Sequence, residues 1–354
     1  MKKLLSLFLL LALALTATAC TPKQYEINQE AVSLTVHFID VGQGDSTLLE
    51  SRGEYVLIDA GEKEYGGSVV RYLKKQGAKH LKYVIATHPH SDHIGGMTKV
   101  INSIDTENFI TVETDQTTRA WLNVLEAVDQ NDVNYLDAEA GATYSFGEAR
   151  FTILAPLSDS YSGYNNYSVV TKVTCGKISF LMTGDAEKQS EKEMLAAGED
   201  LSADVLKCGH HGSSTSSTAA FLKAVNPSYA VISCGENNDY GHPHKETLKK
   251  LNLLGCDIYR TDELGTIVAA TDGETITFSS GDSVLSTSAA GESDETATQQ
   301  NTAEGGYIGN RSSRVFHLPS CSGVATMSEK NKVPLSSRDD AIAQGYTPCS
   351  KCEP

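Results

Sequence analysis

Four side chains that could bind metal ions lie within six residues of one another. His88 and His90 are two residues apart, so on an extended loop both imidazoles can reach one cation, whereas Asp92 and His93 are offset and can serve a second. Neutral imidazole and carboxylate are ligands that zinc and manganese accept. The same groups would be costly to bury without partners. The spacing therefore predicts a two-metal centre, and a solvated polar loop is the alternative.

Further candidate ligands follow three apolar, strand-like segments. Asp185 ends the first, His210 and His211 follow the second, and His242 and His244 follow the third. Because ligands gather at the carboxyl ends of strands in α/β sheets, we expect these side chains to meet near the metal centre. We expect His244, with His242 as second choice, to protonate the leaving group. The alternative for this pair is a capped helix start, which the intervening proline also fits.

A glycine-rich turn carries two carboxylates, Asp40 and Asp45, and a third, Asp59, ends a short apolar segment. All three could accept hydrogen bonds from metal-bound histidines and orient them. Capping of a turn or a strand end accounts for the same residues equally well.

Strands interleaved with helices predict one layered α/β domain over residues 31–285. Segments with the alternation or apolar character of strands are Ser33–Val41, Tyr55–Asp59, Tyr83–Thr87, Arg150–Leu154, Ser168–Thr174, Ile178–Thr183, Ala203–Cys208 and Tyr229–Ser233. Segments with helical spacing are Gly67–Gln76, Glu187–Ala197, Ser217–Val225 and His244–Leu253.

The first twenty residues have the features of a secretory signal: two lysines, an apolar run and small residues that lead to Cys20. Ala17–Cys20 resembles a bacterial lipobox, so we expect residues 1–20 to be a lipoprotein signal and Cys20 to carry the lipid. An ordinary secretion signal is the alternative. The protein is then expected on the outer face of the cell membrane or secreted, held to the membrane by lipid alone.

Residues 286–305 are small, polar and acidic, which predicts a flexible linker. The segment 306–354 that follows regains apolar residues, and Ser337–Gly345 within it has the caps of a helix. Two pairs of soft ligands suit a tetrahedral structural zinc, which would stabilise so small a domain. These ligands are His317, Cys321, Cys349 and Cys352. A Cys349–Cys352 disulfide is the alternative.

Four other cysteines, Cys175, Cys208, Cys234 and Cys256, lie in apolar segments, where lone buried thiols are the simpler interpretation and pairing the alternative. The formal net charge of -16 argues against a protein that coats nucleic acid by charge alone. It does not exclude a nuclease, since bound divalent ions supply positive charge locally.

Together these motifs resemble the metallo-β-lactamase superfamily, and within it the hydrolase domain of ComEC-type competence proteins. The likeness covers residues 34–279, and its characteristic segments are Phe38–Asp45, Leu57–Gly61, Thr87–Gly96, Thr183–Asp185 and Val205–Ser213. The segments 316–321 and 345–352 resemble the Ada-type metal-binding domain, although His317 stands where that family often has a cysteine. The resemblance implies an αββα sandwich followed by a small zinc-stapled domain.

The resemblance also implies roles for single residues. His88 and His90 would hold one metal and Asp92 and His93 the other, with Asp185 bridging both. His210 is the expected additional ligand of the second metal, with His211 as the other choice. In the sequence-based assignment Asp92, His211 and His244 are the catalytic residues, and Asp59 lies under the site. The third histidine that many members supply to the first metal is absent, and Asn165 or Asn166 is the nearest replacement.

The expected activity is phosphodiester hydrolysis by a hydroxide that two zinc or manganese ions activate, with DNA as substrate, because the resembling domain is thought to degrade one DNA strand. One alternative is hydrolysis of another extracellular ester, such as a phosphocholine ester or a lactone. The other is a lipoprotein with a degenerate metal site that binds DNA or cell-wall polymer without cleaving it. Neither metal identity nor oligomeric state follows from the sequence.

Overall fold

The computed structural model of this chain describes residues 31–281 and 283–289 continuously. In the C-terminal segment it describes 307–311, 313–318, 321, 324, 327–335, 341–342, 344–349 and 352. The expected signal segment, Cys20 and most of the expected helix at Ser337–Gly345 lie outside these residues. No helix among the described residues has both the length and the apolar character that a membrane span requires.

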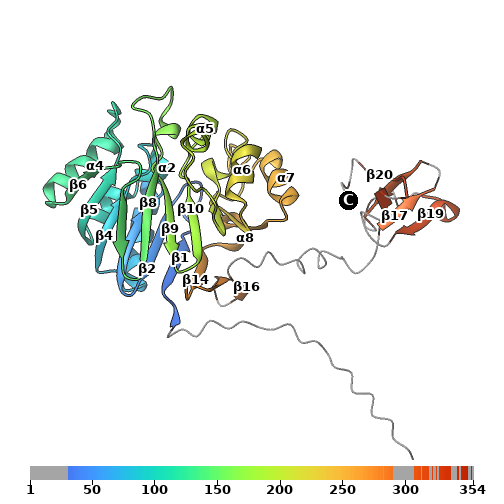
Figure 1. Cartoon of the computed structure of the whole chain (residues 1–354), viewed down its shortest axis with the longest axis horizontal. Helices are drawn as coiled ribbons and strands as arrows, with labels where there is room; N and C mark the ends of the chain where they lie inside the picture. Colours follow the sequence, from blue (N-terminus) through green and yellow to red (C-terminus); the bar gives the residue numbers. More distant parts are fainter. Residues whose placement is uncertain are drawn as a thin grey trace, which may run out of the picture.

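The large domain is built on two β-sheets that pack face to face (Figure 1). Alternate residues of the strands point between the sheets, and Phe38, Phe151 and Phe278 are completely buried there. The nine-stranded sheet runs in the order β16 (Ser283–Ala289), β15 (Thr275–Ser280), β14 (Ile267–Thr271), β1 (Leu34–Phe38), β2 (Thr47–Ser51), β3 (Glu54–Ile58), β4 (His80–Ile85), β5 (Asp105–Thr111), β6 (Asn134–Asp137). The seven-stranded sheet runs in the order β13 (Asp257–Arg260), β12 (Tyr229–Ile232), β11 (Val205–Lys207), β10 (Ile178–Met182), β9 (Val170–Cys175), β8 (Ala149–Ala155), β7 (Thr143–Phe146).

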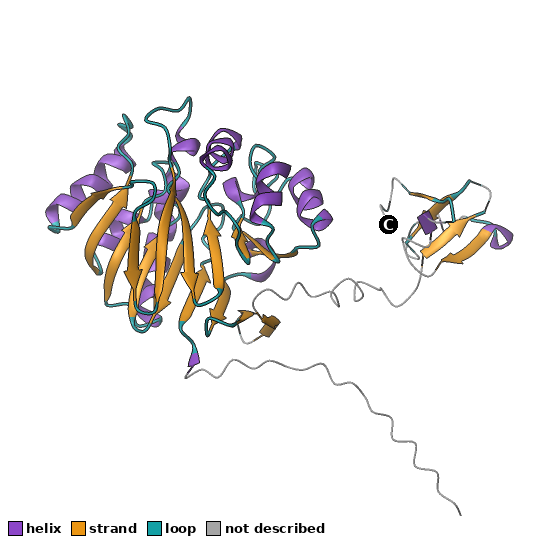
Figure 2. Ribbon diagram, in the orientation of Figure 1, coloured by secondary structure: helices purple, strands orange, loops and turns teal. Residues whose placement is uncertain are grey.

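Helices cover the outer face of each sheet, which confirms the αββα sandwich (Figure 2). On the nine-stranded sheet, apolar side chains of the helices pack against Leu57, Val84 and Phe109. On the seven-stranded sheet, the helices pack against Leu181 and Leu206. The first set is α1 (Gly66–Lys75), α2 (Ser91–Ile94), α3 (Met97–Ile101) and α4 (Arg119–Gln130); the second is α5 (Lys188–Ala197), α6 (Ala219–Val225) and α7 (Lys245–Leu253). A short helix, α8 (Thr261–Leu264), follows β13.

Both sheets contain a parallel half. Strands β3 to β6 run parallel in one sheet, and β10 to β13 run parallel in the other. The loops that follow β4, β10 and β11 carry the predicted ligands, so each ligand loop leaves the carboxyl end of a parallel strand. The expected gathering of these loops is therefore a consequence of the topology.

One boundary differs from the sequence-based prediction. The expected linker begins at residue 286, but β16 extends to Ala289 and pairs with β15 along its length. An outermost strand needs only backbone hydrogen bonds to its neighbour, so the small polar composition of this segment did not reveal it. The domain boundary at 285 is too early, and residues 290–306 lie outside the described part.

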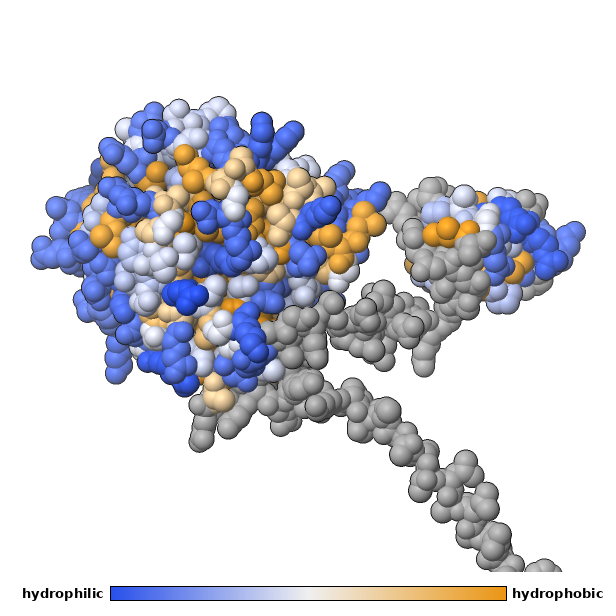
Figure 3. Space-filling view, in the orientation of Figure 1, coloured by the Kyte–Doolittle hydropathy of each residue, from blue (hydrophilic) through white to orange (hydrophobic). Residues whose placement is uncertain are grey.

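The surface shown in Figure 3 mixes hydrophilic and hydrophobic side chains over the large domain.

In the C-terminal segment a small sheet has the order β19 (Lys332–Leu335), β17 (Tyr307–Asn310), β18 (Val315–His317), β20 (Thr347–Pro348). Its core contains the fully buried Phe316 together with Leu335 and Tyr346. So small a core is consistent with a domain that needs an additional staple.

Candidate metal centre

One group of four ligand atoms has the spacing of a closed metal site. It joins Asp92, His93, Asp185 and His211, whose ligand atoms all lie within 4.8 Å of one another. His211 Nε2 is 3.1 Å from Asp92 Oδ2, and His93 Nε2 is 3.2 Å from Asp185 Oδ1. Two ligands bound at about 2.1 Å to a tetrahedral ion lie about 3.4 Å apart, so these separations fit such an ion.

A second group joins His88, His90 and Asp185. His88 Nε2 lies 3.0 Å from His90 Nδ1 and 3.7 Å from Asp185 Oδ2. This group has three ligand atoms within 4.8 Å of one another, whereas the group around His211 has four. The asymmetry that the sequence predicted is thus present in the structure.

Asp185 stands between the two groups and offers one oxygen to each. Its Oδ1 faces His93 and His211, the latter at 3.7 Å, and its Oδ2 faces His88 and His210, the latter at 3.8 Å. The carboxylate is 1 % exposed, and within the described part neither its Oδ1 nor His93 Nε2 has a hydrogen-bond partner. Buried polar atoms normally have a partner, so two such atoms side by side fit a cation held by the group that contains His93 and His211.

The histidines are oriented by acceptors that fix their tautomers. The Nδ1–H of His93 donates to Asp59 Oδ2 at 2.7 Å, and that of His211 donates to the backbone oxygen of Ser233 at 3.0 Å. Thr87 Oγ1 lies 3.1 Å from His88 Nδ1. In each case Nδ1 faces the acceptor and Nε2 faces the cluster, so Nε2 is the nitrogen that a metal would bind once any proton on it has left. Asp59 thus contacts His93, the residue through which it is expected to act.

A buried ion pair supports the second group from below. Lys207 Nζ lies 2.8 Å from Asp45 Oδ2, and Asp45 Oδ1 lies 3.3 Å from His211 Nδ1. Burial alone would raise the pKa of Asp45, but the charges of Lys207 and His211 lower it to about 2. The Asp45 carboxylate thus lies between Lys207 and His211, and its predicted orienting role stays a prediction. Sequence reasoning missed Lys207, although a lysine that ends a buried apolar strand just before two histidines was a usable signal.

In the metal-free protein, protons take the place of cations. Burial opposes the protonation of His211, but the charges of Asp185, Asp45 and Asp92 outweigh it and raise its pKa to about 10. The pKa of His93 is raised well above its usual value in the same way, against burial, by Asp185, Asp59 and Asp92. Burial and the charge of His93 lower the pKa of His88. The carboxylates of the cluster thus attract positive charge, which a divalent ion can supply.

The structure differs from the sequence-based assignment at several residues. His211 lies in the four-atom group and His210 does not, because the turn at 209–212 points the two rings in different directions. His244 precedes α7 and does not line the pocket; its Nδ1 accepts from Ser214 N at 2.9 Å. Asp40 is exposed and accepts from Gly42 N at 3.1 Å, so it caps the turn.

The two asparagines that were candidates for the missing ligand, Asn165 and Asn166, also lie in different surroundings. Asn166 Oδ1 accepts from the backbone N–H groups of Glu187 and Ser190, at 3.2 and 3.1 Å, and thereby supports the start of α5. Asn165 lines the pocket with the ligands, and its Oδ1 is buried without a hydrogen-bond partner in the described part. Of the two, only Asn165 lies where a metal ligand could.

The cluster opens into a pocket of about 320 Å³. His242 lies in its wall and His244 does not, so the second choice of proton donor has the better position. Tyr240 at the rim is 67 % exposed and stacks on His242, with ring centroids 5.6 Å apart. The lining residues are Gln43, His90, Ser91, Asp92, Asn165, Asp185, His210, His211, Tyr240 and His242.

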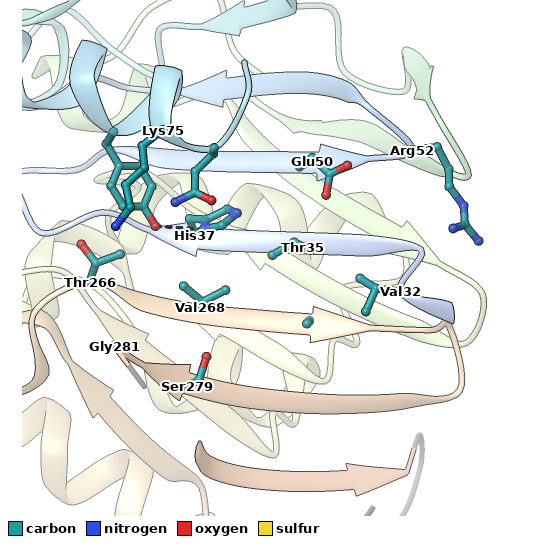
Figure 4. Close-up of a pocket in the computed structure, with 13 residues that line it drawn as sticks. Val32, Thr35, His37, Glu50, Arg52, Lys75, Thr266, Val268, Ser279 and Gly281 are labelled. Carbon is teal, nitrogen blue, oxygen red and sulfur yellow. Dashed lines mark hydrogen bonds between the residues drawn. The ribbon is translucent and has the colours of Figure 1, made fainter. Parts of the chain in front are cut away.

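A larger hollow, of about 680 Å³, lies elsewhere, on the outer face of the nine-stranded sheet (Figure 4). Its floor is formed by side chains of β1 and β14 such as Thr35 and Val268. His37 in this hollow is 2.9 Å from Tyr72 Oη. None of the residues predicted to be functional lines it.

The C-terminal segment contains a third group. His317, Cys321, Cys349 and Cys352 lie with their ligand atoms within 4.8 Å of one another. His317 Nδ1 is buried without a hydrogen-bond partner in the described part, and none of the three cysteines forms a disulfide. A closed set of one imidazole and three thiols fits a structural zinc ion. The four cysteines of the large domain are likewise free and buried, at 175, 208, 234 and 256.

Comparison with protein families assigns the large domain. Residues 39–236 match the family described as the metallo-beta-lactamase superfamily. The chain belongs to this superfamily. Residues 294–354 match the metal binding domain of Ada, which agrees with the zinc-binding cluster. The chain is thus a hydrolase of the metallo-β-lactamase fold that is followed by an Ada-like domain.

Curated relatives narrow the family further. The chain is 33 % identical over 257 residues to ComE operon protein 3 of Bacillus subtilis (strain 168), which covers 66 % of this chain and 32 % of the relative. It is 32 % identical over 242 residues to Recombination protein 2 of Haemophilus influenzae, and the match covers 66 % of this chain and 28 % of that protein. It is 28 % identical to Competence protein ComA of Neisseria gonorrhoeae, and the match covers 70 % of this chain and 33 % of that protein. The chain therefore spans about a third of the length of these competence-related relatives.

Solved structures of the same fold are more distant. YhfI from Bacillus subtilis matches with a TM-score of 0.45 and 14 % identity, over 64 % of this chain and 95 % of that one. Igni18, a metallo hydrolase from Ignicoccus hospitalis, matches with a TM-score of 0.44 and 16 % identity, over 66 % and 98 %.

Proposed function

We propose that this protein is an exported, lipid-anchored hydrolase that cleaves phosphodiester bonds, with DNA as its substrate, at a two-metal centre. The observation that carries the proposal is the pair of ligand groups that share Asp185, one on each oxygen of its carboxylate. Two divalent ions held by these residues would lower the pKa of a water molecule toward neutral pH and would stabilise negative charge on the attacked group.

The residues of the chain have separate tasks in this proposal. Asp92, His93 and His211 hold one ion, and His88 and His90 hold the other, with Asp185 between them. Asp59 and Asp45 keep the imidazoles in the correct tautomer. His242 lies in the pocket wall, but burial and the neighbouring histidines lower its pKa to about 4, so it is neutral at pH 7 and is not assigned as the proton donor.

The choice of a phosphodiester rests on the competence-related relatives, which share the large domain with this chain. The Ada-like domain supports a nucleic-acid substrate, because it would add a binding surface to a hydrolase with a net charge of -16. Export and the lipid anchor rest on the first twenty residues and Cys20.

The test uses residues 21–354, supplied with Mn²⁺ or Zn²⁺ and incubated with single-stranded and double-stranded DNA. The expected result is cleavage that chelation abolishes and that Asp92→Ala reduces to background. Asp40→Ala is the matched control, because this carboxylate caps an exposed turn, and it should leave the rate unchanged. An inactive wild type with both ions bound, or full activity of Asp92→Ala, would refute the proposal.

A second candidate substrate is a phosphocholine ester, and the composition of the pocket favours it. None of the described residues that line the pocket is a lysine or arginine, and the exposed ring of Tyr240 stands at the rim. An aromatic ring without competing cations is a surface that quaternary ammonium groups bind. Parallel assays with DNA, bis-p-nitrophenyl phosphate and p-nitrophenyl phosphocholine decide between the two, and Tyr240→Ala should weaken binding of the phosphocholine ester alone.

A further inference from the structure

We propose that His210 supplies the imidazole that the first metal lacks, so that the adjacent residues His210 and His211 serve different ions. The inference rests on the proposed two-metal centre and deepens it. It keeps His211 as a ligand of the second ion and moves His210 to the first.

The two oxygens of Asp185 divide the surrounding histidines into two sets. Oδ1 faces His93 at 3.2 Å and His211 at 3.7 Å, which are ligands of the second group. Oδ2 faces His88 at 3.7 Å and His210 at 3.8 Å. His210 and His88 thus lie at nearly the same distance from Asp185 Oδ2, the oxygen on the side of the first ion.

His210 is also held in the way the other ligand histidines are held. Its Nδ1 lies 3.1 Å from Glu187 Oε1 and 3.1 Å from Thr215 Oγ1. The Nδ1–H therefore donates to a carboxylate, and Nε2 is left free on the side of Asp185, which is the arrangement of a metal-bound histidine supported by a carboxylate.

The other two histidines near the pocket lack this arrangement. His244 accepts from Ser214 N at Nδ1 and has Tyr240 O 3.2 Å from its Nε2, so both nitrogens are used within the protein. His242 Nδ1 is buried with no hydrogen-bond partner in the described part. A carboxylate contacts Nδ1 of His210 but neither of these two histidines.

The backbone explains how neighbouring residues reach opposite sides. His210 and His211 both have a positive backbone φ, 50° and 53°, which residues other than glycine rarely adopt. Backbone hydrogen bonds hold the turn, from His210 N to Gly184 O at 3.1 Å and from Ser213 N to His210 O at 2.8 Å. The side chain of His211 is 2 % exposed, whereas that of His210 is 24 % exposed. One ring therefore lies in the interior and the other at the mouth of the pocket.

His210 lies outside the compact group of His88, His90 and Asp185, whose ligand atoms are all within 4.8 Å. It would therefore be the outermost ligand of the first ion. Asn165 is the competing candidate, because its Oδ1 is buried without a hydrogen-bond partner in the described part and its Nδ2 lies 3.3 Å from Glu187. We assign Asn165 to the support of Glu187, and the experiment separates the two roles.

The experiment measures metal content and position without reference to activity. Residues 21–354 are loaded with Zn²⁺, the ions per chain are counted by elemental analysis, and anomalous diffraction locates them. His210→Asn is the main variant, because asparagine tolerates the positive φ. It should lose one equivalent, the ion beside His88, and keep the ion beside His211. Glu187→Ala leaves the ligand in place and should weaken the first ion about 10- to 100-fold.

His242→Asn and Asn165→Ala are the matched controls in the same pocket, and both should retain the ion beside His88. Full occupancy of that position in His210→Asn would overturn the assignment, as would its loss in Asn165→Ala alone or its absence from wild type. A wild type that holds both ions but cleaves no phosphodiester would refute the proposed function and leave this assignment intact.

Discussion

Replacement of Asp59 by asparagine tests how far the metal centre depends on a residue that binds no metal. Asp59 is completely buried and accepts from Thr87 N at 2.9 Å, Thr87 Oγ1 at 2.7 Å and His93 Nδ1 at 2.7 Å. Its φ of 58° is compatible with asparagine, so the backbone should be unaffected. The amide can keep an oxygen toward the backbone N–H of Thr87, and its NH₂ group then faces His93.

An NH₂ group in that position reverses the preferred tautomer of His93. Nδ1 would become an acceptor and Nε2 would carry the proton, which must be displaced before a metal can bind. Loss of such an orienting partner costs about 10- to 100-fold in metal affinity, or about 1.4–2.7 kcal/mol. The loss should be larger for the ion held by His93, which contacts Asp59 directly, than for the ion beside His88, which depends on Asp59 only through Thr87.

Competition with a fluorescent zinc chelator measures this affinity. Asp40→Asn is the control, since that carboxylate lies at an exposed turn and should leave affinity unchanged. An Asp59→Asn protein whose affinity for both ions is within twofold of wild type would refute the tautomer argument. Equal weakening of both ions would point to a general disturbance of the fold.

Three further predictions follow from the buried charges and the C-terminal cluster. Lys207→Met leaves Asp45 buried without its partner and should lower the free energy of unfolding by about 3–5 kcal/mol in urea titrations, while Asp45→Asn in the same chain should restore much of it. Zinc binding at pH 7 should release protons, because His93 and His211 have raised pKa values in the metal-free protein, that of His211 at about 10. Affinity should then rise with pH until those groups are neutral, and calorimetry in buffers of different ionisation enthalpy counts the protons; a count of zero contradicts the argument. Cys349→Ser should remove one zinc equivalent per chain and the part of the near-ultraviolet circular dichroism that comes from the C-terminal domain, while the activity of the large domain persists. An unchanged zinc content would be inconsistent with a zinc ion at this cluster.

The sequence predicted the fold class and most ligands because these depend on local patterns. Short apolar segments before Asp59, His88 and Asp185 mark strand ends, and strand ends meet at one edge. Helix α4 was missed although Trp121, Val124 and Val128 have helical spacing and Thr118 caps it, accepting from Trp121 N at 3.4 Å.

The choice between His210 and His211 could not be made in advance. It depends on two positive φ angles that orient the rings, and no pattern of residue types encodes such a pair. The position of His244 was ambiguous for a similar reason, because its spacing suits a helix start as well as a pocket wall. The place of Lys207 in the chain could have marked it as a candidate, but its role depends on Asp45, which is far away in the chain and has its Oδ2 2.8 Å from Lys207 Nζ.

The ligand set has a mechanical consequence. His88, His90, Asp92 and His93 come from the loop after β4 in one sheet, whereas Asp185 and His211 come from loops of the other. No disulfide joins the described parts of the two sheets, so bound ions are cross-links between the halves of the sandwich. An ion present at 100 times its dissociation constant adds about 2.7 kcal/mol to stability. Withdrawal of metal would therefore loosen the contact between the two sheets and make the chain easier for proteases to cut.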